Sequence, residues 1–165
     1  MIVSIIVAAS ENNVIGNNHD LIWSFPNDMS FFKQKTLNHH VIMGRKNFES
    51  IPHKFKPLPN RTNIVITRNL SYDAEGAVVN SLSQAIEFSR KEKQKETFVI
   101  GGGQIYDLSL KENLIDRIYL TRIHKYYEGD TFFPILDEEW KVKEERKFYS
   151  DEKHESNYTF FTYEK

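Results

Sequence analysis

The strongest indication of a fold class comes from residues Thr97–Leu108, which read TFVIGGGQIYDL. The stretch begins as an apolar, β-branched run typical of a strand, continues into three glycines, and then takes on the character of a helix. A tight turn between a strand and a helix needs one or two glycines but not plainly three. Glycine adopts backbone angles closed to other residues and lets a ligand come close to the main chain. The spacing is not G-x-G-x-x-G, but a strand, a glycine turn and a helix can still hold a pyrophosphate.

Further strand-like runs lie on both sides of this unit, separated by helix-like segments. Residues 1–9 are nearly all apolar, which predicts a buried strand with parallel neighbours. Ser81 is a candidate N-cap for a helix over 81–88. Other strands are predicted at 41–43, 63–67, 76–79 and 116–123, other helices at 23–36 and 44–50, and polar loops at 10–20 and 52–59. Alternation over 140–150 and 158–163 predicts an antiparallel hairpin, and the mixed charges of 90–96 predict a solvated helix end.

This order of elements predicts a single α/β domain over residues 1–165. Its sheet is expected to be mostly parallel but mixed, with an antiparallel C-terminal hairpin and helices on both faces. The Asn-rich loop at 10–20 is of the kind that often forms a lid over a ligand.

Composition limits the classes of function. The chain has 165 residues, a net charge of −1, and the hydrophobic and charged fractions of an ordinary globular domain, 39% and 27%. Cysteine is absent, which excludes disulfides, thiolate zinc sites and a cysteine nucleophile, and which fits a reducing cytoplasm. Basic residues are spread along the chain, which argues against nucleic-acid binding. The apolar N-terminal run is too short to span a membrane, and the six scattered histidines give no metal site.

One acidic side chain borders an apolar face of the helix predicted over 23–36. Pro26 suits the first turn, because its missing N–H would have no partner there. Phe25, Met29 and Phe32 recur at i, i+4 and i+7 and predict one apolar stripe, beside which Asp28 lies. Two interpretations stay open at this point. An acid in a first turn can face water and complement the helix dipole, or it can be buried and paired with a ligand.

Two predicted strands end in residues that could bind phosphate. The strand at 41–43 breaks at Gly44 and restarts as a helix that opens with Arg45 and Lys46, where acids are normally favoured. A bound phosphate would explain two cations at that position, and two solvated cations would explain them equally well. Thr67 and Arg68 end the strand at 63–67. In open α/β sheets ligands bind beyond the carboxyl ends of the strands.

Taken together, the motifs of this chain resemble those of the bacterial dihydrofolate reductase family over nearly the full length. The motifs that carry the resemblance are, in chain order, Val14-Ile15-Gly16, Trp23-x-x-Pro26-x-Asp28, Val41-Ile42-Met43-Gly44-Arg45-Lys46, Glu49-Ser50-Ile51, Pro57-Leu58-Pro59-x-Arg61, Ile100-Gly101-Gly102-Gly103-x-Ile105-Tyr106, Leu120-Thr121-x-Ile123 and Glu128-Gly129-Asp130-Thr131-x-Phe133-Pro134. Each is weak alone, but their common order and spacing are specific. The resemblance implies one domain with an eight-stranded sheet, and the reduction of 7,8-dihydrofolate to 5,6,7,8-tetrahydrofolate with NADPH.

The resemblance also implies roles for individual residues. Asp28 would hold the pterin, Arg61 the α-carboxylate of the substrate's glutamate, and the catalytic set would be Asp28, Trp23, Leu21 and Tyr106. The implied substrate-binding residues are Ile6, Asp28, Met29, Phe32, Ile51, Leu58, Arg61 and Thr121. The implied NADPH-binding residues are Ala8, Ile15, Gly16, Asn17, Gly44, Arg45, Lys46, Asn47, Thr67, Arg68, Ile100, Gly101, Gly102, Gly103, Gln104, Ile105 and Tyr106. The peptide between Gly101 and Gly102 is expected to be cis.

The remaining expectations concern organisation and partners. An adenosine-binding subdomain is expected at about 39–95, and a loop subdomain with a lid near 10–24 in the remainder. The implied partners are dihydrofolate and antifolates of the diaminopyrimidine class, and the expected state is a cytoplasmic monomer. Two alternatives stay open: another NADPH-dependent pteridine or pyrimidine reductase of the same fold, and a protein that binds these ligands without turnover.

Overall fold

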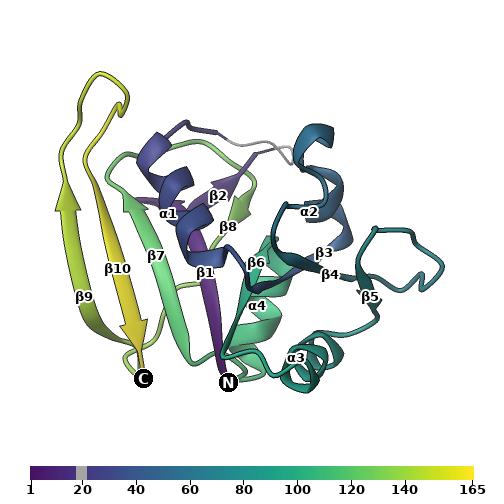
Figure 1. Ribbon diagram of the computed structural model, residues 1–165. Helices are drawn as coiled ribbons and strands as arrows, with labels where there is room; N and C mark the ends of the chain where they lie inside the picture. Colours follow the sequence, from purple (N-terminus) through teal and green to yellow (C-terminus); the bar gives the residue numbers. More distant parts are fainter. Residues whose placement is uncertain (18–21) are drawn as a thin grey trace.

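A computed structural model describes residues 1–17 and 22–165 (Figure 1). The strands are β1 (Ile2–Ser10), β2 (Val14–Gly16), β3 (His40–Gly44), β4 (Thr62–Ile66), β5 (Ala77–Val79), β6 (Glu96–Gly101), β7 (Arg117–Ile123), β8 (Thr131–Phe132), β9 (Lys141–Phe148) and β10 (Tyr158–Glu164). The helices are α1 (Pro26–Thr36), α2 (Arg45–Glu49), α3 (Leu82–Lys91) and α4 (Gly103–Lys111), with a short 3₁₀ helix at His53–Phe55.

The predicted mixed sheet is confirmed. Eight strands lie in the order β5-β4-β3-β6-β1-β7-β10-β9. All pairs from β5 to β7 are parallel, and β10 pairs antiparallel with both β7 and β9. The carboxyl ends of β1, β3, β4 and β6 therefore open toward the same edge, where a ligand site is expected.

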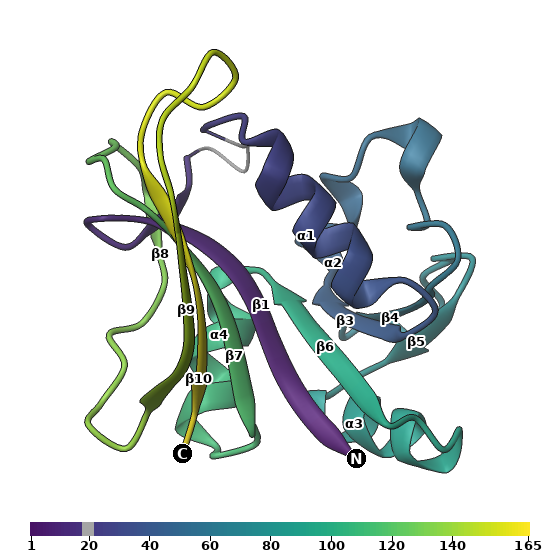
Figure 2. The same ribbon diagram turned by 60° about the vertical axis from the view of Figure 1, so that its left-hand side comes forward.

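Helices cover both faces of the sheet, as predicted, because alternate residues of the central strands are buried on opposite sides. Val3 and Ile5 of β1 pack in one core with residues of α3 and α4, whereas Ile6 packs in the other with residues of α1 and α2. Figure 2 shows α1 and α4 on opposite sides of the strands.

The predicted apolar stripe of the first helix is wrong in part. Helix α1 begins at Pro26, so Phe25 precedes it as the N-cap residue and does not share the helical periodicity. Phe31 is the buried aromatic of the helix, and its ring stacks on Phe160 of β10 with centroids 4.5 Å apart. Phe32 is half-buried and Met29 is 55% exposed, so the face that packs on the sheet is turned from the one predicted.

Three segments predicted as irregular or solvated contain structure. The loop predicted at 10–20 includes β2, which pairs antiparallel with β8 in a separate two-stranded sheet, and the loop at 52–59 includes the 3₁₀ helix. Glu96, predicted to belong to a solvated helix end, instead begins β6. The two strands were not predicted because distant segments provide their pairing partners, which local composition does not reveal. The 3₁₀ helix, by contrast, is closed by local hydrogen bonds such as that of the Phe55 N–H to the Pro52 carbonyl.

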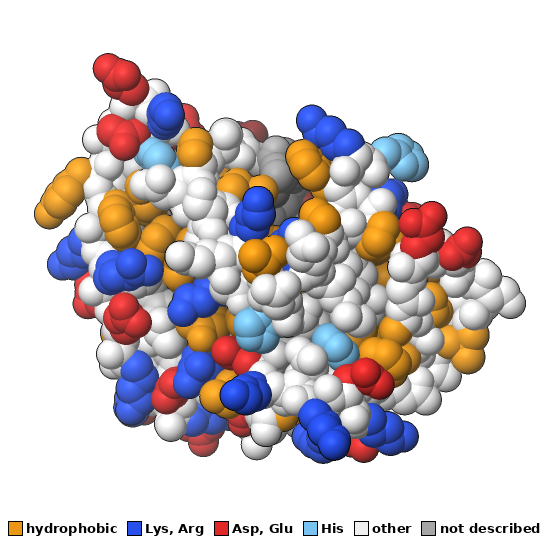
Figure 3. Space-filling model, in the orientation of Figure 1, with side chains coloured by type: hydrophobic (Ala, Val, Ile, Leu, Met, Phe, Trp, Pro, Cys, Tyr) orange, Lys and Arg blue, Asp and Glu red, His pale blue; other side chains and the backbone are white. Residues whose placement is uncertain are grey.

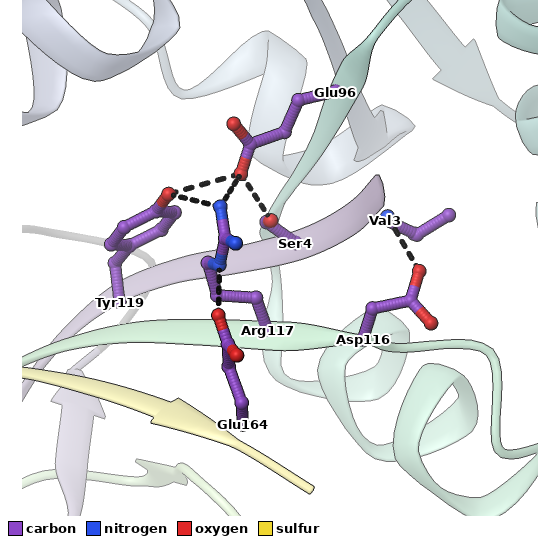
Figure 4. Close-up of polar contacts among 7 residues, drawn as sticks. All are labelled: Val3, Ser4, Glu96, Asp116, Arg117, Tyr119 and Glu164. Carbon is purple, nitrogen blue, oxygen red and sulfur yellow. Dashed lines mark hydrogen bonds and ion pairs between the residues drawn. The ribbon is translucent and has the colours of Figure 1, made fainter. Parts of the chain in front are cut away.

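Glu96 belongs to a polar network at the amino ends of the strands, away from the expected site (Figure 4). Arg117 of β7 lies 3.4 Å from a carboxylate oxygen of Glu96 and 2.8 Å from one of Glu164. Ser4 and Tyr119 donate hydroxyl hydrogen bonds of 2.6 and 3.0 Å to the same oxygen of Glu96. The network joins β1, β6, β7 and β10 and satisfies the half-buried charges that it contains.

On the face drawn in Figure 3, cationic and acidic side chains are interspersed, and no patch of one sign covers an element. Within the described parts of the chain, no helix has the length and apolar character needed to cross a bilayer.

Candidate active site

Most of the apolar residues implied to surround the ligands gather on the face of the sheet that α1 and α2 cover, whereas Ile15 and Ile105 pack in the other core. Ile6 and Ala8 come from β1, and Ile100 comes from the end of β6. They share one core cluster with Trp23, Phe32, Ile51 and Leu58. Most of these side chains are half-buried, so they line the surface of the cluster and can contact a ligand. Met29 lies on α1 but is outside this cluster.

Asp28 is the acid of this face, and it does not simply face water. It is the third residue of α1, half-buried, and it is hydrogen-bonded to the Thr121 side chain. Thr121 is set by the pairing of β7 with β1, in which it lies opposite Ala8. Burial raises the pKa of Asp28 to about 6, although the Thr121 hydrogen bond lowers it. A carboxyl group with this pKa, on an apolar face, is typical of a functional site.

Tyr106 of α4 is a buried phenol of the other core, close enough to Asp28 to sense its charge. Its hydroxyl donates a 3.0 Å hydrogen bond to the carbonyl of Ile6, which fixes the ring under β1. Burial raises the pKa of Tyr106, and the negative charge of Asp28 raises it further. A phenol whose pKa is raised in this way keeps its proton near neutral pH.

The base of the predicted lid is formed by Trp23 on one side and by the end of β2 on the other. Trp23 is half-buried, and its ring lies 5.1 Å from that of Tyr127 between centroids. Ile15 and Gly16 belong to β2, and Asn17 after them is exposed. Leu21, predicted to be catalytic, lies outside the described residues.

Arg61 stands at the far end of the apolar face from Trp23. Its guanidinium donates to the Pro59 carbonyl at 2.9 Å and to the Thr36 hydroxyl at 3.2 Å. The same group lies 5.9 Å from the centre of the Phe32 ring. These contacts hold a half-buried cation beside the apolar face and use two of its five N–H donors, a geometry suited to binding a carboxylate.

Asn63 stabilises the loop that carries Leu58 and Arg61, a role that the sequence did not predict. Its buried side-chain amide donates to the carbonyls of Leu58 and Arg61, and its carbonyl oxygen accepts from the Leu58 N–H, all within 3.0 to 3.2 Å. The contacts span only two to five residues, but nothing in the composition of a strand start marks such a role.

The three glycines have distinct environments. Gly101 has φ +128°, a conformation that other residues rarely adopt, and the Gly101–Gly102 peptide is cis, as the resemblance implied. A Cβ on Gly103 would lie 2.7 Å from Cγ2 of Thr131, so the close approach of β8 excludes a side chain there. A Cβ on Gly102 would meet no atom within 4 Å, so the protein leaves open space above this residue.

The glycine turn also begins α4, whose first turn has no side-chain cap and no acidic residue. The N–H of Ile105 already donates to the Gly102 carbonyl, so the N–H groups before it are the ones that could bind an anion, with the helix dipole in support. Ile105 of α4 packs closely under Gly44, since a Cβ there would lie 3.3 Å from its Cγ1. The glycine turn and the end of β3 are thus adjacent.

The cations predicted to bind phosphate also come together. Gly44 pairs with Ile66 in the β3–β4 register, which brings Arg45 and Lys46 near Thr67 and Arg68. All three cations are exposed, and Arg45 lies 3.9 Å from Glu49 on the same helix turn. Asn47 turns toward the glycines, with Oδ1 3.5 Å from the position of a Cβ on Gly101. Among the described residues, no group of three or more His, Asp or Glu side chains could hold a metal ion.

Comparison with known proteins agrees with this geometry. A family model described as dihydrofolate reductase matches residues 2–165. The dihydrofolate reductase of Bacillus subtilis (strain 168) is 43% identical over 99% of this chain and 94% of its own, and that of Staphylococcus haemolyticus is 36% identical over 99% and 95%. A solved structure of Enterococcus faecalis dihydrofolate reductase, complexed with NADP(H) and RAB-propyl, superimposes with a TM-score of 0.88 at 36% identity, over 99% of this chain and 95% of that one.

Proposed function

The chain belongs to the dihydrofolate reductase family, and from that premise we propose how its residues reduce 7,8-dihydrofolate to 5,6,7,8-tetrahydrofolate with NADPH. The observation that carries the proposal is Asp28: a half-buried carboxyl group with a pKa of about 6, among apolar side chains and beside Thr121.

The residues of the glycine turn fit a bound NADPH. The open space above Gly102 and the uncapped start of α4 would accept the pyrophosphate, and Arg45, Thr67 and Arg68 would hold the 2′-phosphate. Ala8, Ile15, Gly16, Asn17 and Tyr106 would lie around the nicotinamide. When bound, the cofactor supplies a hydride from nicotinamide C4 to pterin C6. The remaining residues of this set would line the adenosine and pyrophosphate path: Gly44, Lys46, Asn47, Ile100, Gly101, Gly103, Gln104 and Ile105.

The substrate would lie across the apolar face between Asp28 and Arg61. The Asp28 carboxylate would accept hydrogen bonds from the pterin 2-amino group and N3 as a two-point pair. The walls would be formed by Ile6, Phe32, Ile51 and Leu58, and the exposed Met29 would border the substrate from outside the cluster. Arg61 would bind the α-carboxylate of the glutamate tail through the donors that Pro59 and Thr36 leave free.

The reaction also needs a proton at pterin N5. Asp28 would not deliver it directly, because the carboxylate is committed to N3 and the 2-amino group. Its charge would instead raise the basicity of N5, and a water near Trp23 and Leu21 would deliver the proton. The apolar walls would strengthen this electrostatic effect by excluding bulk water.

A spectrophotometric assay separates this function from its alternatives. The purified protein should consume NADPH, seen as a fall in its absorbance, only when dihydrofolate is present, and a diaminopyrimidine should stop the reaction. Consumption with a pyrimidine substrate but not with dihydrofolate would indicate another reductase of the fold. Binding of both ligands without consumption would indicate a protein without turnover.

We propose further that the protein acts as a cytoplasmic monomer inhibited by diaminopyrimidine antifolates. Residues 39–95 would form an adenosine-binding subdomain, and residues near 10–24 a lid that closes over the nicotinamide. The packing of Trp23 on Tyr127 supports the idea of a fixed base from which such a lid could move.

A further inference from the structure

A histidine far along the chain reaches the start of the helix that carries Asp28. His154 lies in the connection between β9 and β10, which both ribbon views place beside the first turn of α1 (Figures 1 and 2). Its Nε2 lies 3.2 Å from the backbone nitrogen of Asn27, and its Nδ1 lies 2.8 Å from a carboxylate oxygen of Asp151. The side chain is almost fully buried, although Asp151 is exposed.

These two contacts determine the tautomer. A backbone N–H only donates, so Nε2 must present its lone pair to Asn27. The Asp151 carboxylate only accepts, so Nδ1 must carry the proton. The imidazole therefore accepts through Nε2 toward α1, and the contact with Asp151 selects this tautomer.

His154 accepts a hydrogen bond from a backbone N–H in the first turn of α1 that no side chain at the N-cap accepts. The N-cap residue is Phe25, which forms no side-chain hydrogen bond. Pro26 has no N–H, and the N–H of Asp28 donates to the Phe25 carbonyl, so the Asn27 N–H is the first-turn donor that His154 accepts. Asn27 is the second helical residue, and Asp28 follows it directly.

The ring of His154 also packs against Phe25, the residue before Pro26, and against Tyr158. It lies 5.4 Å from the Phe25 ring and 4.9 Å from the Tyr158 ring, between centroids. The Asn27 side-chain amide donates to the hydroxyl of Tyr158, so the backbone and the side chain of Asn27 are both bound to this cluster.

We propose that His154, oriented by Asp151, is a positioning residue for the reaction: it fixes the first turn of α1 and thereby the direction of the Asp28 carboxylate. The inference rests on the proposed role of Asp28. A small rotation of this turn would move the carboxylate relative to the pterin, whereas the NADPH side of the site lies on other elements.

Two substitutions isolate the acceptor. H154F keeps an aromatic ring between Phe25 and Tyr158 but cannot accept from Asn27, and H154Q offers a side-chain carbonyl at about the reach of Nε2. We expect H154F to lower kcat about three- to tenfold, the usual effect of one hydrogen bond, with the KM for NADPH unchanged. H154Q should restore most of kcat.

The matched control is H40F. His40 is also a buried histidine, with Nδ1 3.0 Å from the Ser89 hydroxyl and its ring 5.7 Å from that of Phe88, but it begins β3 at the opposite end of the sheet. H40F should unfold more readily than the wild type and retain its kcat per active site, titrated with a tight-binding diaminopyrimidine. A kcat of H154F equal to that of the wild type would overturn the inference.

A measurement on the wild-type protein covers the case in which H154F does not fold. Nitrogen-15 NMR should find the His154 Nε2 unprotonated at neutral pH and the Asn27 amide slow to exchange; a proton on Nε2 would overturn the inference. D28N, assayed in parallel, keeps the two claims apart. If D28N is inactive and H154F is fully active, only the role of His154 fails, and if D28N is fully active, the proposed role of Asp28 fails first.

Discussion

At the scale of single residues, the site depends on the Asp28 carboxyl group, which the fold holds where burial disfavours its charged form. Desolvation moves the pKa of Asp28 from 3.8 to about 6, and the hydrogen bond from Thr121 does not compensate. Such a group is costly to the free protein and useful to a ligand that brings its own donors.

Asp28→Asn tests that use. The amide carries no charge to raise the basicity of N5, and it cannot accept both donors of the pterin edge. We expect kcat at neutral pH to fall on the order of 10²- to 10⁴-fold. Steady-state kinetics with dihydrofolate measure the effect, and near-normal turnover would contradict the proposed role.

The same substitution should stabilise the free protein. The pKa of Asp28 is higher folded than unfolded, so between these values the folded state binds more protons, and the free energy of unfolding falls as pH rises. Asparagine does not titrate. The free energy of unfolding of D28N should therefore exceed that of the wild type by about 2–3 kcal/mol above pH 7, and this difference in stability should vanish toward pH 4. Urea unfolding at the two pH values tests this expectation, and equal stability at high pH would argue that the carboxyl is solvated.

Arg61→Lys tests the other end of the substrate. Lysine keeps the charge but not the planar fork that can bind a carboxylate while donating to Pro59 and Thr36. We expect the KM for dihydrofolate to rise on the order of tenfold, the effect of about 1.4 kcal/mol, with kcat little changed. A dihydropterin without the glutamate tail is the control substrate, and its KM should be the same for both proteins. An equal rise in KM for both substrates would show that Arg61 does not bind the glutamate tail.

At the scale of elements, the strand, glycine turn and helix formed by β6 and α4 bring the open backbone of Gly102 to the edge where the cations of α2 lie. Two neighbouring glycines differ in a way that separates binding from folding. Gly102 has space for a Cβ, whereas Gly103 lies against Thr131.

Alanine at each position gives a matched pair. Gly102→Ala should leave the free energy of unfolding within about 0.5 kcal/mol of the wild type and raise the KM for NADPH, because the new methyl group occupies the proposed pyrophosphate path. Gly103→Ala should lower the free energy of unfolding by about 1–3 kcal/mol through the contact with Thr131. An unchanged KM for NADPH in G102A would show that the pyrophosphate does not bind at this turn.

At the scale of the whole molecule, sequence patterns predicted the sheet well because the central strands are mostly apolar and the segments between them carry helix signals. Ser81 is an example: it was predicted as an N-cap, and its hydroxyl accepts the N–H of Gln84 at 3.1 Å. The pairing of β2 with β8 was not predicted, since neither short segment has a pattern of its own.

For the site too, local sequence motifs were predictable and contacts between distant segments were not. Asp28 and the glycines stand out in the sequence, but which of two interpretations holds for Asp28 depends on the apolar cluster that folding assembles around it. His154 contacts a residue 127 positions away, and the turn containing it has only polar composition. Contacts of that kind depend on tertiary packing, which local propensity does not encode.

The most direct measurement of the central claim is a crystal structure of the protein with oxidised cofactor and folate bound together. The account predicts that both carboxylate oxygens of Asp28 lie within hydrogen-bond distance of the pterin 2-amino group and N3, with the nicotinamide facing pterin C6. A pterin ring bound elsewhere, with Asp28 turned to bulk water, would contradict the account even if the fold were unchanged.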